Sequence, residues 1–305
     1  MSGSGGGFSD YGTISAKLQL HSSEKGVQSS QREIEINEFL EQLLKEFNSR
    51  NSESIRKHLN EIAKVLGKEI DGIDAILFGG SIAKSTFIEG TSDVDALVFL
   101  DSAKFLNMSP IALQDSLYEM LQKRFPQTDI QKGRLAVTIK FADYDIQLLP
   151  ALRESGKIRI MDQETNGWSK SINLNAFTSK LTKTNKMNCN KVVPVIKLTK
   201  NLFSKLPQRC QLSGYHVEAL AVEAFSVYNG RNTLYDMTKY LLDYSVKRVL
   251  SPMNDITGQS GIIDDRFGTS NSLRRQNISH YIKNIAGRFS GSDAASVTKE
   301  LFNFD

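Results

Sequence analysis

Asp93 and Asp95 have the residue type and the spacing of a metal-binding pair. They stand two positions apart at the start of an apolar run that continues to Leu100. In a strand, such side chains point to one face and lie roughly 6–7 Å apart. Two carboxylates on one face repel each other unless a cation lies between them, and Mg²⁺ accepts carboxylates while leaving room for phosphate oxygens. The pair therefore predicts a divalent-cation site, with a solvated strand edge as the plainer interpretation.

A glycine turn precedes this pair and has the composition of a phosphate-binding turn. Gly79, Gly80 and Ser81 directly follow the apolar run 73–78 and precede a short segment that we expect to be helical. Backbone N–H groups at such a turn are free to bind an anionic phosphate. Each feature alone is common, but a phosphate-binding turn beside paired carboxylates indicates phosphoryl or nucleotidyl transfer.

A third carboxylate, Asp145, lies in the strand-like run 144–149. Burying a carboxylate in an apolar strand is costly unless a partner neutralises its charge. A metal ion shared with Asp93 and Asp95 would do so, whereas a lone aspartate on an edge strand would have no such role. Asp143, two residues earlier, competes with Asp145 for this position.

The elements that must position these residues follow from hydrophobic periodicity. Apolar residues at helical spacing predict one helix from about residue 30 and another after residue 52. Around the candidate site we expect strands at 73–78, 94–100, 135–141 and 144–149, with helices at 82–88 and 110–124. Residues 151–190 are polar and predict an irregular segment. Further helices are expected from about residue 190, from 213, and over 233–249, 272–288 and 292–303.

The order of strand, Gly-Gly-Ser turn, short helix, Asp-x-Asp and strand resembles the DNA polymerase beta-like nucleotidyltransferase superfamily. The cGAS/DncV-like nucleotidyltransferases, or CD-NTases, have the most similar sequences to two segments, Gly80-Ser81-Ile82-Ala83-Lys84-Ser85-Thr86 and Ser92-Asp93-Val94-Asp95. Oligoadenylate synthases are their relatives. Enzymes of these families make cyclic or linear oligonucleotide second messengers.

The resemblance implies an α+β fold with two lobes. Residues 30–185 would form a nucleotidyltransferase lobe, with a mixed or antiparallel sheet, flanking helices and an N-terminal spine helix. Residues 186–305 would form a helical C-terminal lobe. The Gly/Ser-rich residues 1–29 predict a flexible N-terminal segment.

The resemblance also implies a role for each candidate residue. Asp93, Asp95 and Asp145 would be catalytic and would hold two Mg²⁺ ions, or Mn²⁺ in their place. Asp145 keeps the strand parity of the family's third aspartate, and its offset from the following proline leaves Asp143 as the alternative. The nucleotide would be bound by Gly80, Ser81, Lys200 and Ser213 through its phosphates and by Tyr215 through stacking on the donor base.

Three residues near this set have a second interpretation. Lys84 follows the glycine turn, and it either contacts phosphate or is a solvated lysine. Lys200 either reaches the triphosphate or belongs to a polar helix face. His216 lies at the start of a helix without a visible partner, so we expect it to be structural.

The composition is that of an ordinary globular protein. Of its 305 residues, 40% are hydrophobic and 24% charged, and 38 Lys and Arg against 34 Asp and Glu give a net charge of +4. This mild excess fits a local basic cleft better than an extended RNA-binding surface. The two cysteines lack metal-site spacing, and no apolar run reaches the ~20 residues that span a bilayer. We expect a cytoplasmic protein without zinc, membrane contact or a required DNA ligand.

The function that these patterns favour is template-independent nucleotidyl transfer. The resemblance implies that the product is a cyclic or linear oligonucleotide second messenger made from ATP, GTP or other NTPs. The resemblance places such an enzyme in bacterial antiphage (CBASS) signalling, with a separate effector as partner of the product. The alternatives are a tRNA or poly(A) nucleotidyltransferase, a catalytically silent nucleotide-binding protein, and a substrate-modifying enzyme such as an aminoglycoside nucleotidyltransferase.

Overall fold

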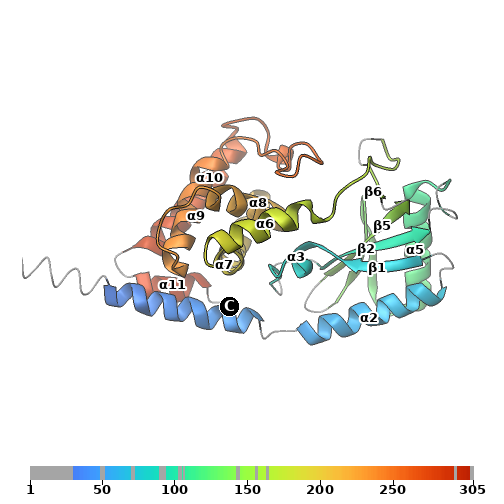
Figure 1. Cartoon of the computed structure of the whole chain (residues 1–305), viewed down its shortest axis with the longest axis horizontal. Coiled ribbons are helices and arrows are strands. Elements are labelled where there is room, and N and C mark those ends of the chain that lie inside the picture. The colour runs from blue at the N-terminus through green and yellow to red at the C-terminus, as the bar shows by residue number, and fades with distance from the viewer. Residues whose placement is uncertain are drawn as a thin grey trace, which may run out of the picture.

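The computed structural model consists of a sheet with its own helices and a helical lobe beside it (Figure 1). It describes residues 30–48, 52–69, 73–88, 94–101, 105, 107–141, 145–154, 157–162, 165–291 and 294–302. The predictions for residues 1–29, Asp93 and Asp143 lie outside this part of the chain.

One mixed sheet carries the motifs that the sequence singled out. Its strand order is β1-β2-β5-β4-β3, and β6 pairs with β5. Only β2 and β5 run parallel, and every other neighbouring pair of these strands is antiparallel. The strands are β1 (Ile73–Phe78), β2 (Val94–Asp101), β3 (Asp129–Lys132), β4 (Val137–Lys140), β5 (Asp145–Glu154) and β6 (Lys157–Ile160).

One face of this sheet is covered by helices α2 (Ser52–Glu69) and α5 (Pro110–Arg124). Alternate residues of β2 and β5, such as Val98 and Leu148, are fully buried in one cluster with Leu66 of α2 and Leu117 of α5. Alternation of this kind is what a strand with one covered face requires. The residues between them therefore point to the opposite face.

The second lobe is built from helices around a separate apolar core. It contains α6 (Asn175–Met187), α7 (Val192–Ser204), α8 (Gly214–Phe225), α9 (Leu234–Arg248), α10 (Leu273–Ser290) and α11 (Ala294–Phe302). Short 3-10 helices, η1 (Gln208–Cys210) and η2 (Asp265–Phe267), lie in the connections. The short helix α3 (Gly80–Ala83) lies between the sheet and this lobe (Figure 1).

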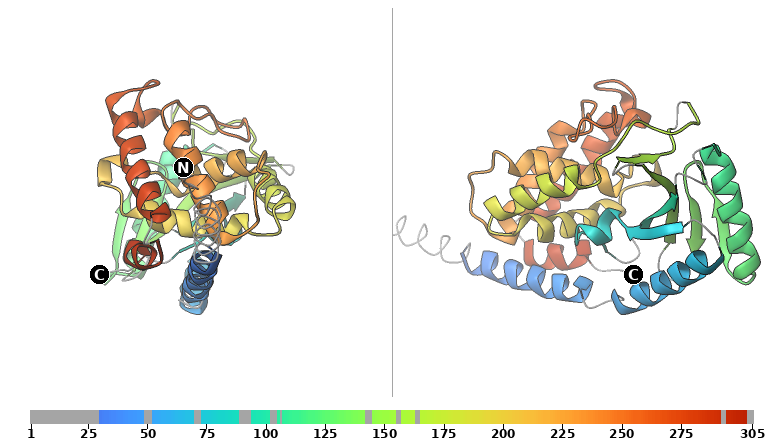
Figure 2. Two further views of the ribbon diagram at one scale, coloured as in Figure 1. Left: turned by 90° about the vertical axis from the view of Figure 1, so that its left-hand side faces the viewer. Right: turned by 45° about the vertical axis from the view of Figure 1, so that its right-hand side comes forward.

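Two successive helices run along one side of both lobes, as Figure 2 shows. The helix over residues 30–48 packs into the core of the helical lobe through residues such as Leu40, whereas Leu59 of α2 packs into the core of the sheet lobe. The spine expected near the N-terminus therefore contacts each lobe with a different half.

The expected α+β class with two lobes is confirmed, and several local predictions need correction. Residues 151–190 are not irregular, because β5 continues to Glu154 and β6 and α6 follow. The apolar residues of α6 are sparse, and only Phe177 and Leu181 are buried hydrophobic positions, so its periodic signal is weak. The helix expected at 82–88 instead spans Gly80–Ala83, and β3 was not predicted.

The expected boundary between residues 185 and 186 falls inside α6. The buried residues Phe177 and Leu181 of this helix belong to the core of the helical lobe. We propose that each element belongs to the lobe whose apolar core contains its buried residues. By this criterion, α6 and the helix over 30–48 belong to the helical lobe.

Candidate active site

Asp95 and Asp145 lie on the same face of adjacent parallel strands. Asp95 pairs with Gln147, and Asp145 is two residues before Gln147 on β5. All three are half-buried and point away from the face that α2 and α5 cover. Strand spacing and rise place the Cα atoms of the two aspartates about 8 Å apart along this diagonal. This separation leaves room for cations and phosphate oxygens between the carboxylates.

The glycine turn is pressed against Asp95. The Gly79 N–H donates to the Asp95 carbonyl oxygen at 2.8 Å. Gly80 has φ +55°, and a Cβ at this position would overlap the Asp95 carboxylate and lie 2.8 Å from its Cγ. Only glycine permits both this conformation and this approach. The turn therefore fixes one carboxylate beside the backbone of α3.

A buried ion cluster joins the end of this turn to the helical lobe. Glu218 of α8, 1% exposed, accepts hydrogen bonds from Lys84, from Lys200 at 2.8 Å and from the Thr86 hydroxyl at 2.5 Å. Lys84 and Thr86 follow α3, and Lys200 belongs to α7. Three segments that are distant in sequence thus meet at one carboxylate, on the border between the lobes.

The charges of this cluster depend on one another. Burial lowers the pKa of Lys200, and the Glu218 carboxylate opposes this effect. Burial would raise the pKa of Glu218, but Lys200 and Lys84 outweigh burial and lower it. Glu218 is therefore ionised at neutral pH. The charge of Asp95 also raises the pKa of Lys200, which places Lys200 within the field of the sheet carboxylate.

Tyr215, near the start of α8, is fixed by Asp255. Its hydroxyl donates to Asp255 Oδ1 at 2.5 Å, and its ring lies 4.8 Å from the Phe177 ring. Asp255 also accepts bonds from the backbone N–H groups of Thr257, Gln259 and Ser260. Burial would raise the pKa of Asp255, but these hydrogen bonds together lower it. The tyrosine ring is thus held by an ionised and fully bonded carboxylate.

Ser213 and the loop beyond Tyr215 complete this side of the site. Ser213 caps α8, its hydroxyl oxygen accepting from the His216 N–H at 3.2 Å. Across the loop, the Gln259 side chain donates to the Asn173 carbonyl at 3.1 Å and accepts from the Asn173 N–H. These bonds tie the segment before α6 to the Asp255 loop, beside Tyr215.

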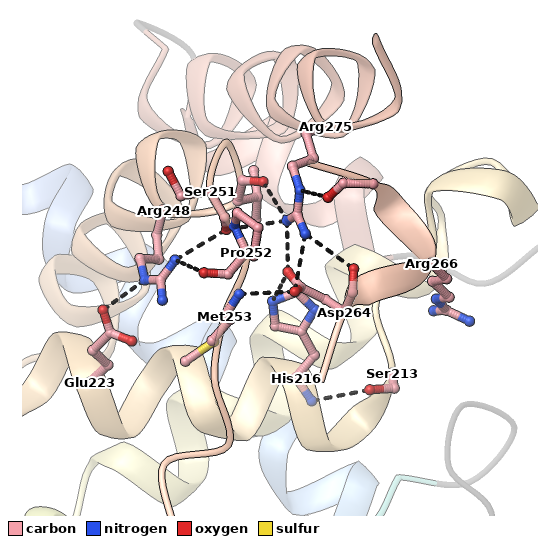
Figure 3. Close-up of polar contacts among 12 residues, drawn as sticks. Ser213, His216, Glu223, Arg248, Ser251, Pro252, Met253, Asp264, Arg266 and Arg275 are labelled. Atoms are coloured by element: carbon pink, nitrogen blue, oxygen red, sulfur yellow. Dashed lines mark hydrogen bonds and ion pairs between the residues drawn. The ribbon is translucent and has the colours of Figure 1, made fainter. Parts of the chain in front are cut away.

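A second buried network supports the start of α8 from behind (Figure 3). Arg275, fully buried, donates to Asp264 Oδ2 at 2.7 Å and to Oδ1 at 3.1 Å. It also donates to the carbonyls of Val249 and Ser251. His216 points from α8 into this network, with its Nε2 3.6 Å from Asp264 Oδ2. Arg275 therefore holds the loop after α9 against α10, and His216 of α8 lies beside the same carboxylate.

The structure brings together most of the residues that the sequence suggested. Gly80, Ser81, Asp95 and Asp145 lie on or beside the open face of the sheet, while Lys200, Ser213 and Tyr215 lie on the facing helices. The His216 side chain points into the Arg275–Asp264 network, and its backbone N–H donates to Ser213. Sequence reasoning assigned no role to Glu218, Thr86, Phe177 or Asp255. Asp255-Ile256-Thr257-Gly258 has the composition of an Asx turn, which is a local signal for the hydrogen bonds that Asp255 accepts.

Within the described residues, no group of three or more His, Cys, Asp and Glu side chains is arranged to hold a metal ion. Asp95 and Asp145 supply two candidate ligands, and Asp93 and Asp143 lie outside the described residues. In the same part of the chain, no helix is long and apolar enough to cross a membrane.

A mixed sheet with a glycine turn, paired strand carboxylates and a facing helical lobe is the architecture of polymerase beta-like nucleotidyltransferases. Residues 33–185 match the SMODS family model, described as Second Messenger Oligonucleotide or Dinucleotide Synthetase domain. The match covers half of the chain, and the chain belongs to this family. No protein of curated function matches the sequence.

Solved structures of CD-NTases share the fold. Escherichia coli MS115-1 CdnC, solved in a complex with HORMA-deltaN, is 13% identical with a TM-score of 0.61 over 83% of this chain and 91% of that chain. Escherichia coli DncV bound to 3′-deoxy GTP is 13% identical with a TM-score of 0.60 over 92% and 90%. Elizabethkingia meningoseptica CdnE cyclic dinucleotide synthase, with GTP and Apcpp, is 13% identical with a TM-score of 0.57 over 77% and 92%.

Gly80→Ala should displace the Asp95 carboxylate, because the added methyl group occupies its position. We expect nucleotide turnover to fall by about 100-fold or more, with a loss of about 1–2 kcal/mol in stability from the left-handed backbone. Steady-state kinetics and thermal unfolding measure the two effects. Gly287→Ala is the matched control, since its Cβ meets no atom within 4 Å. Turnover by Gly80→Ala within threefold of wild type would contradict this geometry.

Stability should depend on pH through His216. Burial lowers its pKa to about 4, although Asp264 opposes this effect. The unfolded chain binds this proton near pH 6.5 and the folded chain only near pH 4, so stability is lost as pH falls through this window, by about 3 kcal/mol at most. His216→Gln should flatten the curve of unfolding free energy against pH between these values, and His280→Gln, at an exposed position, should not. Parallel curves for wild type and His216→Gln would refute this assignment.

Proposed function

We propose that this chain joins nucleoside triphosphates into a cyclic oligonucleotide second messenger. The observation that carries the proposal is the placement of Asp95 and Asp145 on one sheet face, next to the Gly80 turn and opposite a helical lobe with a buried cation cluster. Membership of the second-messenger synthetase family supports the same reaction. A linear oligonucleotide is the alternative product.

The donor set fits divalent metal ions. Asp95 and Asp145 supply carboxylate oxygens, the ligands that Mg²⁺ and Mn²⁺ take, on a half-buried face where two carboxylates repel without a cation. We propose that these residues and Asp93 hold two ions. When bound, the ions would neutralise charge on the attacking and leaving oxygens.

The residues of the chain would then position the reactants. The N–H groups of the turn at Gly80 and Ser81 would bind the β- and γ-phosphates of the donor, and Ser213 would add a hydroxyl contact. Tyr215, fixed by Asp255, would stack on the donor base. Lys84, directly after α3, and Lys200, on α7, would supply positive charge where the two lobes meet.

Asp145 would lie at the acceptor side of the reaction. A carboxylate there favours loss of the proton from the 2′- or 3′-hydroxyl of the acceptor nucleotide, which attacks the α-phosphate of the donor. The new ester bond forms as the bond to pyrophosphate breaks. A second transfer onto the first nucleotide would close the ring.

The substrates would be ATP, GTP or other NTPs, since solved relatives contain such nucleotides. We propose that the reaction takes place in the cytoplasm as part of antiphage signalling, and that a separate effector binds the product.

Asp95→Asn and Asp145→Asn should each reduce product formation by at least about 1,000-fold, because each removes a carboxylate from the reacting centre. Labelled NTPs incubated with Mg²⁺ and then treated with phosphatase measure this loss. Wild type should give a phosphatase-resistant, cyclic product. Asp129→Asn, on the exposed end of β3, is the matched control and should keep full turnover.

Two results would reject the proposal. Extension of a labelled RNA in place of an NTP-derived product would favour a tRNA or poly(A) nucleotidyltransferase. Nucleotide binding without turnover by wild type, over all four NTPs with Mg²⁺ and Mn²⁺, would favour a catalytically silent binding protein.

A further inference from the structure

The ammonium group of Lys200 has its three donors directed at protein acceptors. Its Nζ lies 2.8 Å from Glu218 Oε1, 3.2 Å from the Thr86 carbonyl oxygen and 3.3 Å from Thr86 Oγ1. A lysine has three N–H donors, so these acceptors account for all of them. Its side chain is 4% exposed. In this arrangement Lys200 can contact a phosphate only by giving up one of these bonds.

Lys84 shares the same carboxylate but differs in two respects. Among the described residues, Glu218 Oε2 is the one hydrogen-bond acceptor of the Lys84 ammonium, whereas Lys200 has three. Its side chain is 11% exposed, more than that of Lys200. Lys84 is thus the more accessible of the two cations.

The surroundings of Lys84 place it where the nucleotide is expected. It directly follows α3, whose first residues Gly80 and Ser81 form the turn beside Asp95. Its Nζ lies 4.8 Å from the centre of the Phe177 ring and 5.6 Å from that of the Tyr215 ring. A cation between the phosphate-binding turn and the stacking tyrosine can reach the charged part of a nucleotide bound to both.

The other members of the cluster are arranged as its support. Thr86 donates to Glu218 and also accepts from Lys200, so both oxygens of Glu218 are bonded. Buried ion pairs contribute little to net stability, since desolvation offsets their attraction. The position of this cluster at the border of the two lobes is explained if it holds a charge in place for a ligand.

We propose that Lys84 is the lysine that contacts the nucleotide phosphates, and that Glu218, Lys200 and Thr86 are positioning residues that hold it there. This assignment rests on the proposed function and gives Lys200 an indirect role. It predicts that the two lysines differ in how their loss affects substrate affinity.

Four variants separate these roles. Lys84→Met should raise KM for the NTP by about 10–100-fold, the effect of losing a charged hydrogen bond, in addition to the fall in melting temperature that follows when Glu218 loses one partner. Lys84→Arg should recover most of this loss. Lys200→Met should mainly lower the melting temperature, because Glu218 keeps its charge while losing one partner. Lys200→Met with Glu218→Gln should restore stability and raise KM less than Lys84→Met does.

Lys197→Met is the control on the same helix, since Lys197 bonds Asn48 outside the cluster, and it should leave KM unchanged. KM, kcat and melting temperature are measured for each variant with MgATP and MgGTP. The assignment is overturned if Lys84→Met keeps KM within twofold of wild type. It is also overturned if the stable double variant raises KM more than Lys84→Met does, because Lys200 would then be the ligand. Absence of turnover by wild type would instead reject the proposed function.

Discussion

The carboxylate of Glu218 is the point on which the relation between the two lobes depends. It lies on α8 of the helical lobe, yet it bonds Lys84 and Thr86 from the segment that follows the glycine turn. A buried carboxylate must keep such partners, because leaving it unpaired costs several kcal/mol. The turn at Gly80 is therefore tied to the helices that carry Lys200 and Tyr215, and the parts of the site are held together across two separate cores.

The sheet provides the other half of this arrangement. One face is fully occupied by the cores of α2 and α5, so the polar residues of β2 and β5 can only lie on the other. These strands pair in parallel with Asp95 opposite Gln147, so Asp145, two residues before Gln147, lies on the same face as Asp95. Antiparallel pairing with β4 and then β6 along the far edge of β5 keeps that strand central over its whole length. The carboxylates thus lie on two neighbouring strands inside the sheet.

Much of this site could be predicted from the sequence because its signals are local. The strand 73–78 and the helix 110–124 agree with β1 and α5, since apolar periodicity and Pro110 mark them clearly. The contacts that complete the site instead join residues that are far apart in the sequence. Glu218 is 132 residues from Thr86 and 134 from Lys84. The sequence of α8 does not distinguish a buried, ionised glutamate from a solvated one. Asp255 likewise acquires its role only because α8 lies beside its loop. The α6 helix was missed because its apolar positions are few.

The central claim is that Asp95 and Asp145 bind metal ions on the sheet face that looks toward the Glu218 cluster. Anomalous diffraction from crystals grown with Mn²⁺ and a non-hydrolysable ATP analogue tests it most directly. We expect Mn²⁺ within about 2.0–2.6 Å of oxygen atoms of both carboxylates, with the triphosphate against the Gly80 turn. Mn²⁺ bound away from these two aspartates, or a nucleotide bound on another surface, would contradict the account.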